Sequence, residues 1–211
     1  MPRRRSPSLR GKYFHVYNRA VTGVLPFVSE VNAQRFIQTI QYYSYETDGI
    51  SFSRFVKMSP GVRSNYAFSH YLHSKKIVSI LEYCVLKNHY HIVLKQKEVH
   101  GVRKFMQKIS SSFSHYYNIK SLRRGAVFES RYKSKRIFTK LQLKQVVRYV
   151  HINPLKHGYV ENLDRALEYP FSSAQFYELK IPTYLDTKSV KRLFRSYSEY
   201  YHFLCYHKRK K

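Results

Sequence analysis

The chain has 211 residues, with 39 lysines and arginines against 12 acidic residues and a formal net charge of +27. This length allows a core that folds without disulfides or a structural metal, and the two cysteines lack the spacing of a zinc site, so we expect a reduced, cytoplasmic protein. The first residues lack the apolar run of a secretory signal, and no segment approaches the roughly 20 apolar residues that span a bilayer, which argues against a membrane role.

The first part of the chain predicts a strand, a helix and a long connection. Residues 12–20 are rich in aromatic and β-branched side chains and predict a strand that follows a basic, disordered tail over residues 1–11. Ser29 then precedes residues 30–46, whose apolar side chains recur at helical spacing and predict a helix. Residues 47–75 contain glycine, proline and several serines, and predict a long loop or an insertion.

The middle of the chain predicts a hairpin, a helix and another strand. Residues 76–87 and 89–96 are two β-rich runs separated by a polar break, which indicates a closely connected antiparallel pair. From residue 99 to about 120 the apolar positions step by three and four, as expected for an amphipathic helix. Residues 125–138 return to strand character, with an interruption near residues 129–131.

A further helix is predicted by Thr139 and Gln142, which fit a capping box in front of an apolar stripe over residues 143–152. The order of elements indicates an α+β domain: a ferredoxin-like antiparallel sheet with packed helices and one added helix. We expect this domain to cover residues 12–178, and residues 179–211 to form a basic, aromatic C-terminal extension.

Charge and aromatic content together favour a nucleic acid partner. Basic side chains attract phosphates, and the rings of the 21 tyrosines and 14 phenylalanines can stack on unpaired bases, which favours single strands in particular. An anionic membrane surface would also attract such a charge, and more than half of the tyrosines are expected to be core residues.

The sequence "NHYHIVL" places His89 and His91 two residues apart on a predicted strand. Side chains at this spacing project from the same face, so the pair could supply two ligands of a metal site. The pattern alone is weak in a chain with 11 histidines, and two histidines hydrogen-bonded to neighbours remain the simpler alternative.

Five separated motifs occur in an order that resembles the REP-associated tyrosine transposases, a branch of the single-tyrosine HUH transposases. They are "YFHVYNRAVTG", "VLKNHYHIVL", "FESRYKSKRIF", "RYVHINPLKHGYV" and "YPFSSAQFY", and they span residues 12–178. The chain departs from the family at Leu86 and Lys87, where Met-Pro is usual, at Phe128, where Trp is common, and in "NPLKHG". These departures affect packing or DNA contacts more than chemistry.

The resemblance implies a metal-dependent transposase that cleaves and rejoins single-stranded DNA next to hairpin repeats. Its nucleophile would be Tyr149, which forms a 5′-phosphotyrosine, and its Mg²⁺ or Mn²⁺ ligands would be His89, His91 and Asn153. A monomer or a homodimer would act on DNA in the nucleoid. Without the resemblance, Tyr149 would be read as a core residue and Asn153 as the N-cap of a helical turn before Pro154.

The sequence indicates less about the residues that contact DNA than about the reaction. The candidates are a basic strand, a pair of residues after the helix that carries Tyr149, and the N-terminal tail, namely Arg131, Lys133, Lys135 and Arg136, then Lys156 with His157, then Arg3, Arg4 and Arg5. Each group could equally be a solvated surface, and the tail a solubilising extension.

Two other functions stay open from the sequence. The same basic, aromatic surface could bind structured nucleic acid without cutting it, an alternative favoured if Lys87 disturbs the first ligand. A replication initiator or relaxase would share the chemistry, although this chain has no P-loop and no room for a helicase.

Overall fold

The computed structural model describes residues 9–178 and 183–205. Its centre is an antiparallel sheet of four strands in the order β2-β3-β1-β4. The strands are β1 (Tyr13–Arg19), β2 (Val78–Leu86), β3 (His89–Gln96) and β4 (Lys133–Ile137). This sheet, with its packed helices, confirms the α+β ferredoxin-like fold predicted from the sequence.

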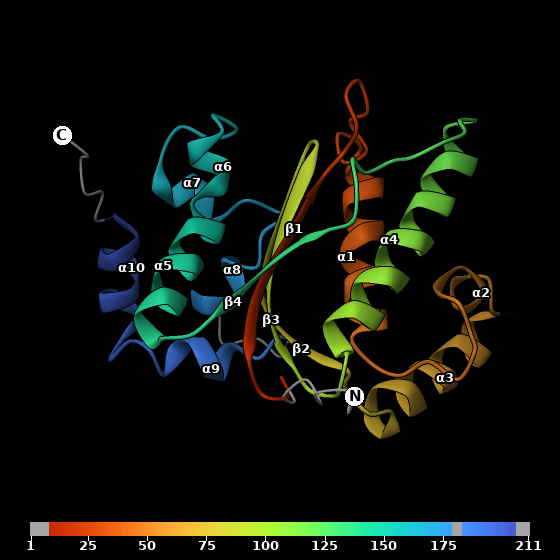
Figure 1. The fold of residues 1–211 in the computed structure, drawn as a ribbon, viewed down its shortest axis with the longest axis horizontal. Coiled ribbons are helices and arrows are strands. Elements are labelled where there is room, and N and C mark those ends of the chain that lie inside the picture. The colour runs from red at the N-terminus through yellow and green to blue at the C-terminus, as the bar shows by residue number, and fades with distance from the viewer. Residues whose placement is uncertain (1–8, 179–182, 206–211) are drawn as a thin grey trace, which may run out of the picture.

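Helices cover both faces of the sheet (Figure 1). Helices α1 (Glu30–Tyr43) and α4 (Gly101–Lys120) lie on one face, and α5 (Lys140–His151) lies on the other. The later helices also lie on the α5 side: α6 (Asn153–Lys156), α7 (Leu163–Leu167), α8 (Gln175–Glu178), α9 (Thr187–Lys191) and α10 (Tyr197–Cys205). The sheet therefore separates the molecule into an α1/α4 side and an α5 side.

Of the two alternatives for residues 47–75, a long loop or an insertion, the long loop is wrong. These residues contain helices α2 (Phe52–Val56) and α3 (Pro60–His73). The residues that suggested a loop instead start the helices: Ser51 accepts a hydrogen bond from the Arg54 N–H, and Pro60 occupies the first turn of α3. Both positions are favourable at helix N-termini, where backbone N–H groups have no intrahelical acceptor.

Two hydrophobic clusters hold the helices to the sheet. On the α1/α4 side, Phe36, Tyr90 and Phe105 are fully buried in a large aromatic core. On the α5 side, Val147 and Val150 pack in a second cluster that also contains residues of α9 and α10. The part of the predicted C-terminal extension that forms α9 and α10 thus packs on the domain, and residues 179–182 and 206–211 lie outside the described part of the chain.

The capping signal before α5 has the expected effect. The Thr139 hydroxyl accepts a hydrogen bond from the Gln142 N–H at 3.0 Å, and the Gln142 side chain accepts one from the Phe138 N–H at 2.8 Å. Strand β4 is shorter than predicted, because residues 125–132 form only one isolated bridge, between Phe128 and Ala20, before β4 begins.

Within the described residues, none of the helices is long and apolar enough to cross a membrane.

An acidic residue is buried beneath α5. Glu82 of β2 is fully buried, and loss of solvation raises the pKa of its carboxyl well above the usual value. The Nε2 atom of His151 lies 3.9 Å from the carboxyl, and burial lowers the pKa of this imidazole to about 3. The His151 imidazole also contacts the Tyr200 hydroxyl of α10. Both groups are therefore neutral at neutral pH.

Replacement of Glu82 by glutamine should stabilise the protein more at pH 8 than at pH 5. The folded protein keeps a proton on Glu82 that the unfolded chain releases above about pH 4.5, so this group lowers wild-type stability as the pH rises. The glutamine amide does not titrate, so the variant does not lose stability in this way. The loss in the wild-type free energy of unfolding is about 1.4 kcal/mol for each pH unit over which Glu82 is ionised only in the unfolded chain. Urea unfolding at both pH values measures the difference.

The exposed Glu168→Gln variant controls for the loss of one carboxylate. An equal effect of Glu82→Gln at the two pH values would contradict a neutral, buried Glu82.

Candidate active site

His89 and His91 lie together on the α5 face of the sheet. Both imidazoles are buried, and their ring centres are 5.4 Å apart. Tyr90 between them points to the opposite face, where it packs against Phe36 in the aromatic core. Because successive side chains of β3 point to opposite faces of the sheet, the two imidazoles lie on one face and Tyr90 lies on the other.

Each imidazole is held through its Nδ1 atom. His89 Nδ1 lies 2.7 Å from Asn88 Oδ1, and His91 Nδ1 lies 2.9 Å from Nε2 of His15 on the neighbouring strand β1. Hydrogen bonds at Nδ1 orient each ring and leave its Nε2 lone pair for another ligand.

Tyr149 of α5 approaches this pair from the helical side. The centre of its ring lies 5.2 Å from that of His91 and 5.9 Å from that of His15, in both cases edge to face. The Nζ atom of Lys156 lies 4.7 Å from the centre of the same ring. Burial raises the pKa of the Tyr149 hydroxyl, and the nearby Asn153 amide acts in the opposite direction.

Asn153 is fully buried one helical turn after Tyr149. Neither polar atom of its amide has a well-formed hydrogen-bond partner among the described residues, although the amide lies close enough to Tyr149 to affect its pKa. Asn153 is the first residue of α6 and Ile152 is its N-cap, so the alternative role of Asn153 as an N-cap is wrong. A buried amide that lacks well-formed hydrogen bonds destabilises the folded protein. Such an amide is therefore a candidate ligand for a bound ion.

A pocket of about 270 Å³ opens in front of these side chains. His89, His91 and Tyr149 line it together with His157, which the sequence offered only as a DNA contact beside Lys156. The lining residues that the sequence did not single out are Tyr17, Asn18, Arg19, Glu129 and Ser130. Tyr17 and Arg19 follow His15 at intervals of two along β1, a strand pattern that could have predicted their common face. No local pattern predicted a role for Glu129.

The imidazoles of the site are neutral at neutral pH. Burial lowers the pKa of His91 to about 2 and that of His89 to about 4, and neighbouring histidines act in the same direction. Burial also lowers the pKa of His15 to about 4, with a further contribution from Lys135. Neutral imidazoles offer lone pairs, which a metal ion requires.

The basic residues that were predicted to contact DNA lie in several parts of the structure. Lys133 lines the pocket in front of His89, His91 and Tyr149, and Lys135 pairs with His15 on the same face of the sheet. The guanidinium of Arg136 lies 4.7 Å from the centre of the Phe138 ring, and Arg131 lines a separate hollow beside α4. Arg3, Arg4 and Arg5 lie outside the described residues.

The residues present fit a divalent cation, although among the described residues no three His, Cys, Asp or Glu side chains form a metal-binding group. The candidate set is instead two neutral imidazoles and one amide, His89, His91 and Asn153, and the amide lacks other well-formed partners. Such a set leaves coordination positions for phosphate oxygens, which favours Mg²⁺ or Mn²⁺ over a closed zinc site.

Comparison with known families identifies this part of the chain. A family model described as "Transposase IS200 like" matches residues 52–153, a segment that contains both histidines of β3, Tyr149 and Asn153. Residues 52–153 thus match the IS200-like transposases, and the resemblance found in the sequence is confirmed.

A solved structure shares the fold. It is described as "Structure of the REP associates tyrosine transposase bound to a REP hairpin", and it is 16% identical to this chain. The match has a TM-score of 0.55 and covers 84% of this chain and 85% of that one. Comparison with curated proteins finds no significant match.

Removal of the His15 imidazole should weaken metal binding without removing a ligand. His15→Phe keeps a ring at this position but leaves His91 Nδ1 without its partner, so Mn²⁺ affinity should fall roughly tenfold. Electron paramagnetic resonance of free Mn²⁺ measures the affinity. His115→Phe, at an exposed position of α4, is the matched control. Equal Mn²⁺ affinities of the His15 variant and the wild type would rule out this supporting role.

Proposed function

We propose that the protein is a divalent-metal-dependent strand transferase that cleaves and rejoins single-stranded DNA next to hairpin repeats. The convergence of Tyr149, His89, His91 and the buried Asn153 amide on one side of the sheet is the observation that carries this proposal. The family match supports transposase activity, and the structural relative bound to a REP hairpin supports a hairpin substrate.

The proposed reaction is a phosphoryl transfer to Tyr149. The phenol loses its proton, its oxygen attacks the scissile phosphorus, and the bond to the 3′ oxygen breaks. The 3′ oxygen takes up a proton and leaves as a hydroxyl, while the 5′ phosphate remains on Tyr149. Attack by a 3′ hydroxyl reverses these steps, so strands are rejoined without ATP.

The side chains around Tyr149 have separate tasks in this reaction. Asn153 lowers the pKa of the Tyr149 hydroxyl against the effect of burial, and the Lys156 ammonium places a positive charge over the ring. Lys133 and Arg19 line the same pocket and can hold the phosphates on either side of the break. A cation bound by His89, His91 and Asn153 would polarise the phosphate and stabilise the leaving oxygen.

Two residues at which the chain departs from the family pattern, Lys87 and Phe128, lie outside the proposed site. The Nζ atom of Lys87 lies 5.1 Å from the centre of the Tyr159 ring, and Lys87 is not among the residues that line the catalytic pocket. Phe128 is buried in the aromatic core, where its ring centre lies 5.6 Å from that of Tyr90. Both positions therefore leave the proposed chemistry intact, which weakens the argument for a non-cleaving binder.

Tyr149→Phe should abolish covalent adduct formation and leave hairpin affinity nearly unchanged. The substitution removes only the nucleophilic oxygen and keeps the ring between His91 and Lys156. The assay uses a 5′-flanked and 3′-flanked DNA hairpin with Mn²⁺ or Mg²⁺, and denaturing electrophoresis detects the adduct. EDTA should suppress the adduct in the wild type, and His91→Ala should do so at ordinary metal concentrations.

Tyr159→Phe is the matched control, because Tyr159 lies nearby on the α5 side but does not line the catalytic pocket. An adduct formed by Tyr149→Phe would assign the nucleophile to another tyrosine. Tight hairpin binding without an adduct from the wild type, on any flanking sequence, would favour the non-cleaving alternative.

DNA binding should depend steeply on salt. If about six phosphates are contacted, affinity should fall roughly a thousandfold between about 50 and 200 mM salt. Replacing both Lys133 and Lys135 by alanine should reduce the slope of log affinity against log salt by about one to two units, because two phosphate contacts are lost. Fluorescence anisotropy measures the slope. A slope that is unchanged in the double variant would remove these lysines from the DNA-binding surface.

A further inference from the structure

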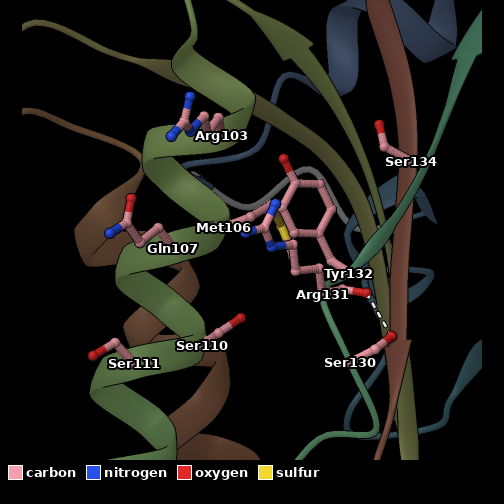
Figure 2. A pocket seen from close by; sticks show the side chains of 9 residues that line it. All are labelled: Arg103, Met106, Gln107, Ser110, Ser111, Ser130, Arg131, Tyr132 and Ser134. Carbon is pink, nitrogen blue, oxygen red and sulfur yellow. Dashed lines mark hydrogen bonds between the residues drawn. The ribbon is translucent and has the colours of Figure 1, made fainter.

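A second and larger pocket lies beside α4, on the other side of the segment that leads into β4. Its volume is about 830 Å³, and its walls are one side of α4 and the residues Ser130, Arg131, Tyr132 and Ser134 (Figure 2). This size is within the usual range of small-molecule and cofactor sites, about 300 to 1,000 Å³. None of the residues that the proposed chemistry uses lines it.

The two pockets are neighbours. Ser130 lines both of them, and along β4 Lys133 lines the catalytic pocket while Ser134 lines the second one. Successive side chains of a strand point to opposite faces, which accounts for this division. A DNA strand held at the catalytic pocket can therefore continue across residues 130–134 into the second pocket.

The lining suits a nucleobase. The half-buried Tyr132 ring supplies a flat surface against which a base can stack, next to the buried Met106 side chain. The Gln107 amide on α4 and the hydroxyls of Ser111 and Ser134 can supply donors and acceptors for the edge of a base, whereas the Ser130 hydroxyl donates to the Arg131 carbonyl. Figure 2 shows Arg131 and Tyr132 extending from their segment toward α4.

The charges suit the backbone of the same nucleotide. Arg103 of α4 and Arg131 line the pocket, both are exposed, and no acidic residue lines it. Both guanidiniums are close enough to Tyr132 to lower the pKa of its hydroxyl, against the larger effect of burial. Arg103 belongs to α4 and Arg131 to the segment before β4, so positive charge reaches the pocket from two of its walls, as phosphate contacts on both sides of a stacked base would require.

We propose that this pocket binds one unpaired nucleotide of the DNA strand that flanks the hairpin, with its base stacked on Tyr132 and its phosphates bound by Arg103 and Arg131. The proposal rests on the proposed function, because it assumes a single-stranded DNA substrate. It adds a site for reading flanking sequence that is separate from the catalytic residues.

The test uses a DNA hairpin from an inverted repeat beside the coding sequence, with single-stranded flanks on both sides and EDTA present to prevent cleavage. 2-Aminopurine replaces one flanking base at a time, and its fluorescence is quenched when it stacks on an aromatic ring. We expect quenching at one position on binding, and loss of that quenching in Tyr132→Leu. Phe138→Leu, which removes an exposed ring at the end of β4, should keep the quenching.

Affinity provides a second readout. An abasic site at the quenched position should weaken binding of the wild type about tenfold, the usual effect of one stacked base, and should have little effect on Tyr132→Leu. Arg103→Gln should weaken binding of the intact strand, whereas Arg63→Gln on α3 removes the same charge away from both pockets and should not.

The outcomes separate this proposal from the proposed function. If every 2-aminopurine position responds equally in the wild type and in Tyr132→Leu, the pocket is not a nucleotide site, although adduct formation on Tyr149 would still support the strand transferase. A Tyr132-dependent signal without any adduct would support the pocket and contradict cleavage. Failure of the wild type to bind the hairpin would overturn both.

Discussion

The register of β3 between β1 and β2 is the constraint on which the proposed site depends. It directs His89 and His91 toward α5 and places Tyr90 in the aromatic core of the opposite face. Because side chains alternate along a strand, a slip of one residue would bury the imidazoles in that core and bring Tyr90 into the pocket. The aromatic packing around Tyr90 opposes this slip, so one set of hydrophobic contacts stabilises the fold and also orients the candidate metal ligands.

Helix α5 completes the site through the same kind of packing. Val147 and Val150 are buried against the sheet, and this contact fixes the rotation of the helix about its axis. Given that rotation, Tyr149 faces His91, and Asn153 follows one turn later. The neutral pair of Glu82 and His151 lies beneath the helix and ties it to α10 through Tyr200. The position of the proposed nucleophile is thus set by contacts that extend into the C-terminal helices.

Charge is distributed so that the candidate metal ligands stay neutral while positive side chains lie around the pocket, as the proposed phosphate binding requires. Burial holds the pKa values of His89 and His91 far below neutrality, so both keep their lone pairs. Positive charge comes instead from side chains at the rim, among them Lys133 and Lys156. Arg103 and Arg131 extend this positive surface to the second pocket, which is consistent with a single strand that crosses residues 130–134.

The sequence by itself determined the order of elements, the hairpin that carries the two histidines and the capped helix that carries Tyr149, because strand alternation, helical spacing and capping are local properties. The ordered motifs also identified the family. Only the tertiary structure decided that residues 47–75 are helical, that His15 contacts His91 from the neighbouring strand, and that Asn153 is buried without well-formed partners. These features arise from segments distant in sequence, whose contacts depend on strand order and packing rather than on any local pattern.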